Sequence, residues 1–120
     1  MGGSIFVLLV DDDAAFADAA ARSFESLGMR AVVALGPNGA LDVFDDAIDV
    51  VVTDIKLPAG EPYGFALTHM IRNKRPGAAM ILMTAHRDLF QNEIGPPGGM
   101  LCNPLEIAEL CRSIRALLTQ

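Results

Sequence analysis

Residues 7–13 read VLLVDDD, an apolar run that passes directly into three adjacent aspartates. The four apolar residues have the composition of a β-strand buried on both faces. Adjacent carboxylates repel one another, so a chain that gathers them at the end of a buried strand is expected to present them to something positive. Asp11 and Asp12 are therefore the first candidate functional residues, whereas Asp13 fits the N-cap of the helix that follows.

Apolar runs of strand length alternate with helical patterns along the rest of the chain. The strand runs are nearly all apolar and do not alternate with polar residues, which is typical of a parallel sheet covered on both faces. We therefore predict a doubly wound α/β fold with a five-stranded parallel sheet. The expected strands are 4–10, 29–35, 48–55, 78–84 and 100–102, and the expected helices are 14–27, a short one after a turn at 36–39, 65–73, two turns at most within 87–94, and one opened by Asn103 and Pro104.

The first and last helices carry apolar residues at helical spacing, which predicts the faces that they bury. For the first helix the expected inward residues are Phe16, Ala20, Phe24 and Leu27, with Gly28 as the C-cap. For the last helix they are Leu105, Ala108, Cys111, Ile114, Leu117 and Leu118.

The composition suits one domain over residues 1–120, because 52% of the residues are hydrophobic. A net charge of −6 argues against direct binding of nucleic acid, which needs clustered Lys and Arg. No apolar run is long enough to cross a membrane, and the first residues lack the pattern of a signal peptide. We expect a cytoplasmic protein in which Cys102 and Cys111 are buried thiols.

Polar residues end other expected strands too, and in a parallel sheet these ends meet at one edge, where ligands bind. They are Asp54, Thr84 and Asn103. Carboxylate oxygens suit Mg²⁺, and a carboxylate beside such an ion can attack a phosphoryl group. Each residue also has a plainer interpretation, because Asp13 or Thr84 could cap a helix and Asp54 could form a turn.

The ordered set of strand ends resembles the receiver domain of two-component response regulators over essentially the whole chain. The segments that carry the resemblance are VLLVDDD at 7–13, VVVTDIKLP at 50–58 and MILMTAH at 80–86. The resemblance implies the flavodoxin-like (βα)5 receiver fold. It also implies a partner histidine kinase or phosphotransfer protein, and a downstream protein or output domain.

The same resemblance assigns roles to individual residues. It implies that Asp54 accepts the phosphoryl group and that Asp11, Asp12, Asp54 and the backbone carbonyl of Lys56 hold Mg²⁺. Thr84 stands where the family has a hydroxyl that contacts the phosphoryl group.

Two positions depart from the family pattern near the end of the last strand. Asn103 stands where a lysine is usual, so a neutral donor replaces a charge that would contact the phosphoryl oxygens. Asn103 could also simply cap the last helix. Met100 stands where the family often has an aromatic residue that reports the state of the switch. The acceptor side of the site therefore looks intact, and the reporting side looks altered.

Three functions remain open on these residues. The first is a phospho-accepting receiver that is not itself an enzyme. The second is a degenerate receiver that binds protein partners independently of phosphorylation, which Asn103 and Met100 favour. The third is a phosphohydrolase with an aspartate nucleophile, which is disfavoured because such enzymes commonly have a second acid two residues later, where this chain has Lys56.

Overall fold

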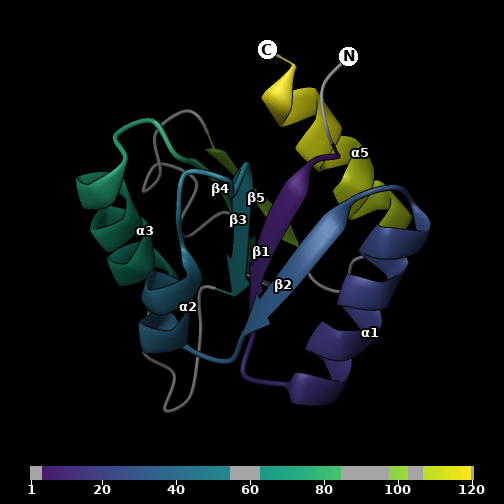
Figure 1. Ribbon diagram of the computed structural model, residues 1–120, viewed down its shortest axis with the longest axis horizontal. Helices are drawn as coiled ribbons and strands as arrows, with labels where there is room; N and C mark the ends of the chain where they lie inside the picture. The colour runs from purple at the N-terminus through teal and green to yellow at the C-terminus, as the bar shows by residue number, and fades with distance from the viewer. Residues whose placement is uncertain (1–3, 55–62, 85–97, 103–106, 120) are drawn as a thin grey trace.

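The strands form one parallel five-stranded sheet with the order β2-β1-β3-β4-β5 (Figure 1). The computed structural model describes residues 4–54, 63–84, 98–102 and 107–119. Because the chain steps from β1 outward to β2 and then back across β1 to β3, the sheet is wound in both directions. The predicted doubly wound α/β fold is confirmed, and the expected helix within 87–94 lies outside the described residues. The elements are β1 (Phe6–Val10), α1 (Ala14–Ser26), β2 (Arg30–Ala34), α2 (Pro37–Val43), β3 (Val50–Asp54), α3 (Tyr63–Lys74), β4 (Ala79–Thr84), β5 (Gly98–Cys102) and α5 (Ile107–Leu118).

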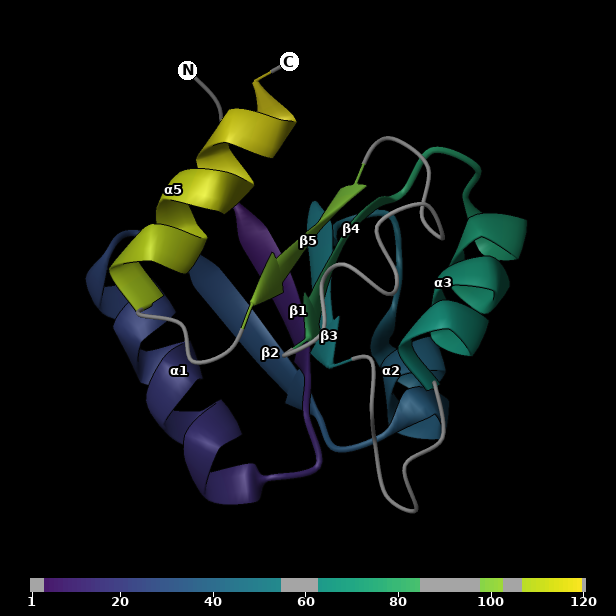
Figure 2. The same cartoon turned by 180° about the vertical axis from the view of Figure 1, so that it is seen from behind.

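Helices cover both faces of the sheet and divide the core into two layers. Helices α1 and α5 lie on one face, and α2 and α3 lie on the other (Figures 1 and 2). Successive strand residues point to opposite faces, so Val50 and Val52 pack in the α1–α5 layer while Val51 packs in the α2–α3 layer. The strands are therefore buried on both sides, which explains why their sequences are continuous apolar runs.

Helix α1 has a defined signal at each end. The side chain of Asp13 accepts a hydrogen bond from the backbone N–H of Phe16, which makes Asp13 the N-cap. At the other end Gly28 has a φ of 89°, and the N–H of Met29 donates to the carbonyl of Phe24 at 2.9 Å. This is the Schellman arrangement, in which a residue with positive φ ends the helix. The predicted roles of Asp13 as a cap and of Gly28 as the terminator are confirmed.

The predicted buried face of α1 is wrong at two positions. Phe16 is 38% exposed and Leu27 is 43% exposed, whereas Ala17, Ala20 and Phe24 are buried. Leu27 is the C-cap residue, and its backbone no longer has helical dihedral angles, with φ at −97° and ψ at 14°. Its side chain therefore does not follow the helical period. The small side chains of the two alanines allow close contact with the sheet, and this contact turns the helix toward Ala17 and away from Phe16.

The buried face of α5 also differs from the prediction. Leu110, Cys111 and Ile114 are buried, and Leu117 and Leu118 pack against the same layer. Ala108 is exposed, so that part of the prediction is wrong. The helix is rotated so that the larger Leu110 meets the sheet, which buries more apolar area than an alanine would. Cys111 is a buried thiol as predicted, while Leu105 and the side chain of Cys102 lie outside the description.

Three expected boundaries also need correction. The segment 36–39 is not a separate turn, because Gly36 is the N-cap of α2 and Pro37 begins the helix. Helix α3 already begins at Tyr63, within the expected loop, and β5 begins at Gly98. Pairing with β4 extends β5 into the glycine pair, since Met80 lies opposite Gly98.

No helix in the described part of the chain combines the length and the apolar character needed to cross a lipid bilayer.

Candidate functional site

The carboxyl ends of β1, β3 and β4 lie next to one another in the sheet. Val10 pairs with Thr53, so Asp11 and Asp54 each follow a paired residue on neighbouring strands. Asp54 pairs with Met83, which places Thr84 one residue further along β4. The topology therefore brings Asp11, Asp54 and Thr84 to one edge, as the sequence predicts.

Asp11 is buried although it carries a carboxyl group. Only 6% of its surface is exposed. Its backbone N–H donates to the carbonyl of Ala34 at 3.1 Å, and its Oδ1 accepts from the backbone N–H of Asp13 at 2.9 Å. Burial raises the pKa of Asp11 above its ordinary value of 3.8, and the charges of Asp12 and Asp13 raise it further, while the hydrogen bond from Asp13 opposes the shift.

The three adjacent aspartates have different environments. Asp11 is buried, whereas Asp12 and Asp13 are exposed. Asp13 uses its side chain to cap α1 and its backbone N–H to hold the carboxylate of Asp11. The third aspartate is therefore an orienting residue that connects the helix to the site, and Asp12 is left facing solvent beside it.

The end of β3 combines a half-buried acid with a fully buried hydroxyl. Asp54 is half-buried, and Thr53 before it has no exposed surface. The Oγ1 of Thr53 donates to the main-chain oxygen of Asp54 at 3.1 Å. Thr84, at the end of β4, is 5% exposed. Thr53 is not among the site residues predicted from the sequence, although a threonine after three valines is a signal that could have indicated it.

Some of the predicted site residues cannot be compared with the structure. Lys56 and Asn103 lie outside the described residues. The backbone of Met100 lies in β5 opposite Leu82, which is the predicted strand, but its side chain is not described. The roles of all these residues stay predictions.

The described edge offers hard oxygen donors to a cation. Within the described residues, no group of three or more His, Cys, Asp or Glu side chains is arranged to hold a metal ion. Mg²⁺ usually takes only one or two carboxylates and fills its other positions with water, carbonyl or phosphate oxygens. Asp11 and Asp54 on adjacent strands fit that requirement, and the raised pKa of Asp11 reflects a buried carboxyl group that a cation would help to ionise.

A half-buried carboxylate beside a second acid and a hydroxyl can also react with an electrophile such as a phosphoryl group. A family model for the response regulator receiver domain matches residues 7–95. The chain belongs to this family.

Curated relatives of this receiver are longer proteins. The probable transcriptional regulatory protein TcrX of Mycobacterium tuberculosis is 30% identical over 122 residues, which cover 98% of this chain and 51% of TcrX. The transcriptional regulatory protein CpxR of Escherichia coli is 30% identical over 115 residues, which cover 93% of this chain and 48% of CpxR. The receiver thus spans about half the length of these relatives.

Solved structures show the same fold over nearly the whole receiver. The non-phosphorylated HemR receiver domain from Leptospira biflexa superposes with a TM-score of 0.81 at 24% identity, covering 98% of this chain and 96% of that one. A receiver domain protein from Clostridium thermocellum gives a TM-score of 0.83 at 24% identity, covering 96% and 94%. These matches show the receiver fold, and the roles of individual residues are argued from their chemistry.

Proposed function

We propose that residues 1–120 form a single phospho-accepting receiver domain, with Asp54 as the acceptor and a histidine kinase or phosphotransfer protein as the donor. The observation that carries the proposal is the register of β1 against β3, which brings Asp54 beside the buried carboxyl group of Asp11. Family membership supplies the reaction class, because receivers are regulatory phosphoacceptors.

In the proposed reaction a carboxylate oxygen of Asp54 attacks the phosphorus atom of a phosphohistidine. A new O–P bond forms while the N–P bond breaks, and the departing imidazole keeps the electron pair and takes up a proton. Asp54 must be ionised to attack, and it is only half-buried at the end of β3.

The residues proposed to hold Mg²⁺ are Asp11, Asp12, Asp54 and the backbone carbonyl of Lys56. The three carboxylates are not grouped for a metal in the described structure, so binding of the ion would have to draw them together. Bound there, Mg²⁺ would neutralise the carboxylates and the incoming phosphoryl oxygens. Asp13 supports this arrangement, because its N–H orients the Asp11 carboxylate.

The hydroxyl of Thr84 and the amide of Asn103 are proposed to donate to the phosphoryl oxygens. Asn103 brings no charge, so its hydrogen bond is weaker than that of the usual lysine. Met100 is proposed as the residue that reports the change along β5, and its flexible side chain has no aromatic ring to reorient.

The departure at Asn103 favours a second candidate, which is a receiver that binds protein partners without depending on phosphorylation. A phosphohydrolase is disfavoured because Lys56 stands where such an enzyme would need its second acid. In either receiver reading the chain acts in the cytoplasm on a downstream protein or output domain, with no direct contact to nucleic acid or membrane.

Intact mass after treatment with a small phosphodonor tests the assignment. We expect the parent to gain one phosphoryl group in Mg²⁺ and none in EDTA, and we expect Asp54→Asn to gain none. Asp18→Asn, an exposed acid on α1, is the matched control and should behave as the parent does. A mass gain that persists in Asp54→Asn would refute Asp54 as the acceptor. A parent that gains no mass would favour the second candidate, the receiver that binds partners without depending on phosphorylation.

A further inference from the structure

We propose that the Thr53 hydroxyl is a positioning group for Asp54, a role that rests on the proposed acceptance of a phosphoryl group by Asp54. Thr53 is fully buried at 0% exposure, and its Oγ1 donates to the main-chain oxygen of Asp54 at 3.1 Å. A buried hydroxyl is thus attached to the backbone of the residue that carries the chemistry.

Packing alone does not account for a threonine at this position. The three preceding strand residues, 50–52, are all valine, and valine has nearly the same shape as threonine. By strand alternation Thr53 points to the same face as Val51, which lies in the apolar α2–α3 layer. Burial of a hydroxyl costs free energy unless it is hydrogen-bonded, so valine would pack here without that cost. The feature that distinguishes threonine is its hydrogen bond to the carbonyl of Asp54.

At the end of β3 a hydrogen bond from a side chain can restrain the backbone, because strand pairing stops there. Pairing with β1 ends at Val10 opposite Thr53, whereas pairing with β4 continues to Asp54 opposite Met83. The backbone of Asp54 is therefore at the limit of the ladder. The Thr53 hydroxyl restrains the peptide group that follows Asp54 and with it the ψ angle of that residue. Holding the nucleophile in one orientation raises the reaction rate, because small displacements of reacting groups lower it.

The test is the second-order rate constant for phosphorylation by a small phosphodonor in Mg²⁺. We expect Thr53→Val to lower it about three- to tenfold, the effect of losing one neutral hydrogen bond. Thr53→Ser keeps the hydroxyl and should stay within about twofold of the parent. Thr68→Val is the matched control, because the Thr68 hydroxyl is also buried and donates to a backbone carbonyl, that of Gly64, but within α3. It should leave the rate unchanged.

Two further readouts separate positioning from simple stabilisation. The ¹³C resonance of the Asp54 carbonyl should move in Thr53→Val and stay near its parent value in Thr53→Ser. Urea unfolding should show Thr53→Val to be at least as stable as the parent, and Thr53→Ala is the second variant without a hydroxyl if Thr53→Val does not fold.

A rate that is unchanged in Thr53→Val, although the carbonyl resonance has moved, would overturn the proposal. Equal losses of rate in Thr53→Val and Thr53→Ser would also overturn it, since they would point to packing. A parent that accepts no phosphoryl group would instead refute the proposed function, and this inference with it. A slow Thr53→Val with a parent-like Thr53→Ser would support it.

Discussion

The two ends of the parallel sheet use charged side chains in opposite ways. At the amino end, cationic side chains satisfy backbone carbonyls in the segments that lead into the strands. The Arg75 guanidinium donates to the carbonyl of Ile48 at 2.7 Å and to that of Asp46 at 3.3 Å, just before β3. Arg72 donates to the carbonyl of Ala78, just before β4.

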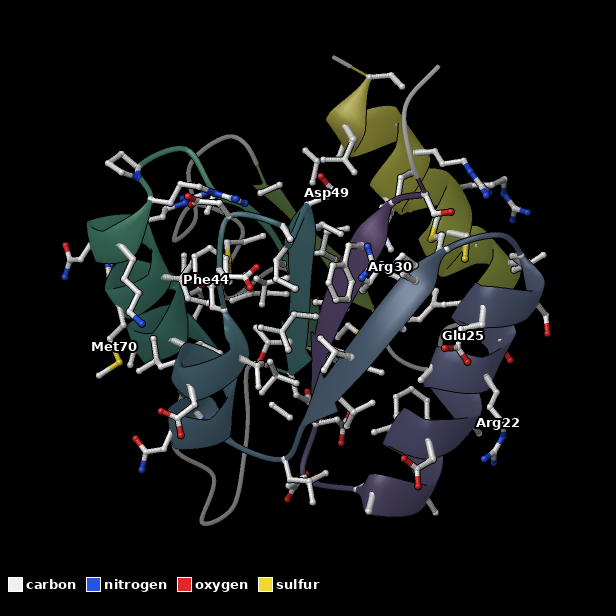
Figure 3. All side chains as sticks on the ribbon, viewed as in Figure 1. Arg22, Glu25, Arg30, Phe44, Asp49 and Met70 are labelled. Carbon is white, nitrogen blue, oxygen red and sulfur yellow. The ribbon has the colours of Figure 1, made fainter. Side chains whose placement is uncertain are left out.

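Other contacts strengthen the same end. Arg115 of α5 donates to the carbonyl of Leu27, the C-cap of α1. Asp49 accepts from the backbone N–H of Phe6, and the Arg30 guanidinium lies 4.1 Å from the centroid of the Phe6 ring. Arg30 and Asp49 lie at the upper end of the sheet in Figure 3, opposite the start of α1.

At the carboxyl end, carboxylates crowd together around a buried acid. Asp11 is desolvated, and the charges of Asp12 and Asp13 make its ionisation harder. One end of the sheet therefore contributes stability, while the other end is electrostatically strained. Such strain fits the proposed site, because a bound cation would relieve the repulsion among the carboxylates.

The largest effect is expected at the amino end. We expect Arg75→Met to lower the free energy of unfolding by about 2 kcal/mol, because two carbonyls lose a charged donor. The ring of Phe44, whose centroid lies 5.1 Å from the guanidinium, loses a cation–π contact as well. Urea unfolding measures the change. Arg22→Met, an exposed arginine of α1 labelled in Figure 3, is the control and should change stability by less than about 0.5 kcal/mol. Equal effects of the two substitutions would contradict the comparison.

A smaller effect on the free energy of unfolding is expected at Asp13, which caps α1 and also holds the carboxylate of Asp11. Asp13→Ala should cost about 1 kcal/mol of stability through loss of the N-cap of α1. Asp13→Asn keeps an oxygen that can cap the helix, so it should be more stable than Asp13→Ala at neutral pH. Both substitutions remove the charge that disfavours ionisation of Asp11, so this effect cancels in the comparison. Thermal unfolding compares the two. If both lose the same stability, the side chain of Asp13 is not acting as a cap.

The smallest change in the free energy of unfolding is expected for Asp11→Asn, and this change is an increase. Because the pKa of Asp11 is raised in the folded protein, the folded state holds the proton more tightly than the unfolded state does. The free energy of unfolding therefore decreases as the pH rises from the ordinary pKa of 3.8 through the raised folded value. Asp11→Asn removes this cost, and its Oδ1 can still accept from the N–H of Asp13.

Unfolding measured across that pH range checks this prediction. Asp11→Asn should be more stable than the parent at neutral pH, and the difference should vanish below the ordinary pKa. Mg²⁺ should narrow the difference at neutral pH, since a bound cation stabilises the carboxylate of the parent. A parent that is more stable than Asp11→Asn at pH 7 without Mg²⁺ would show that the carboxyl end is not strained.

Local signals in the amino-acid sequence predict the strands, their parallel arrangement and the edge of the sheet at which Asp11, Asp54 and Thr84 meet. These features follow from continuous apolar runs and from the residues that end them, which are local signals. The ends of α1 were predictable for the same reason, because Asp13 and Gly28 act on backbone groups within a few residues.

Which side of each helix is buried depends on tertiary packing and could not be predicted from the sequence. The sequence predicted Phe16 and Ala108 as inward residues, and both are exposed, while Ala17 and Leu110 are buried. A helical period defines a stripe, but the rotation of the helix about its axis depends on how closely its side chains fit the sheet.

Tertiary structure also gives different roles to charged and polar residues that look alike in the sequence. Burial and a backbone donor distinguish Asp11 from the exposed Asp12, and a carbonyl partner gives Thr53 its proposed role. The arginines that bind carbonyls before β3 and β4 lie up to 29 residues from their partners. Desolvation and long-range hydrogen bonds depend on what surrounds a group in space, so no local pattern in the chain encodes them.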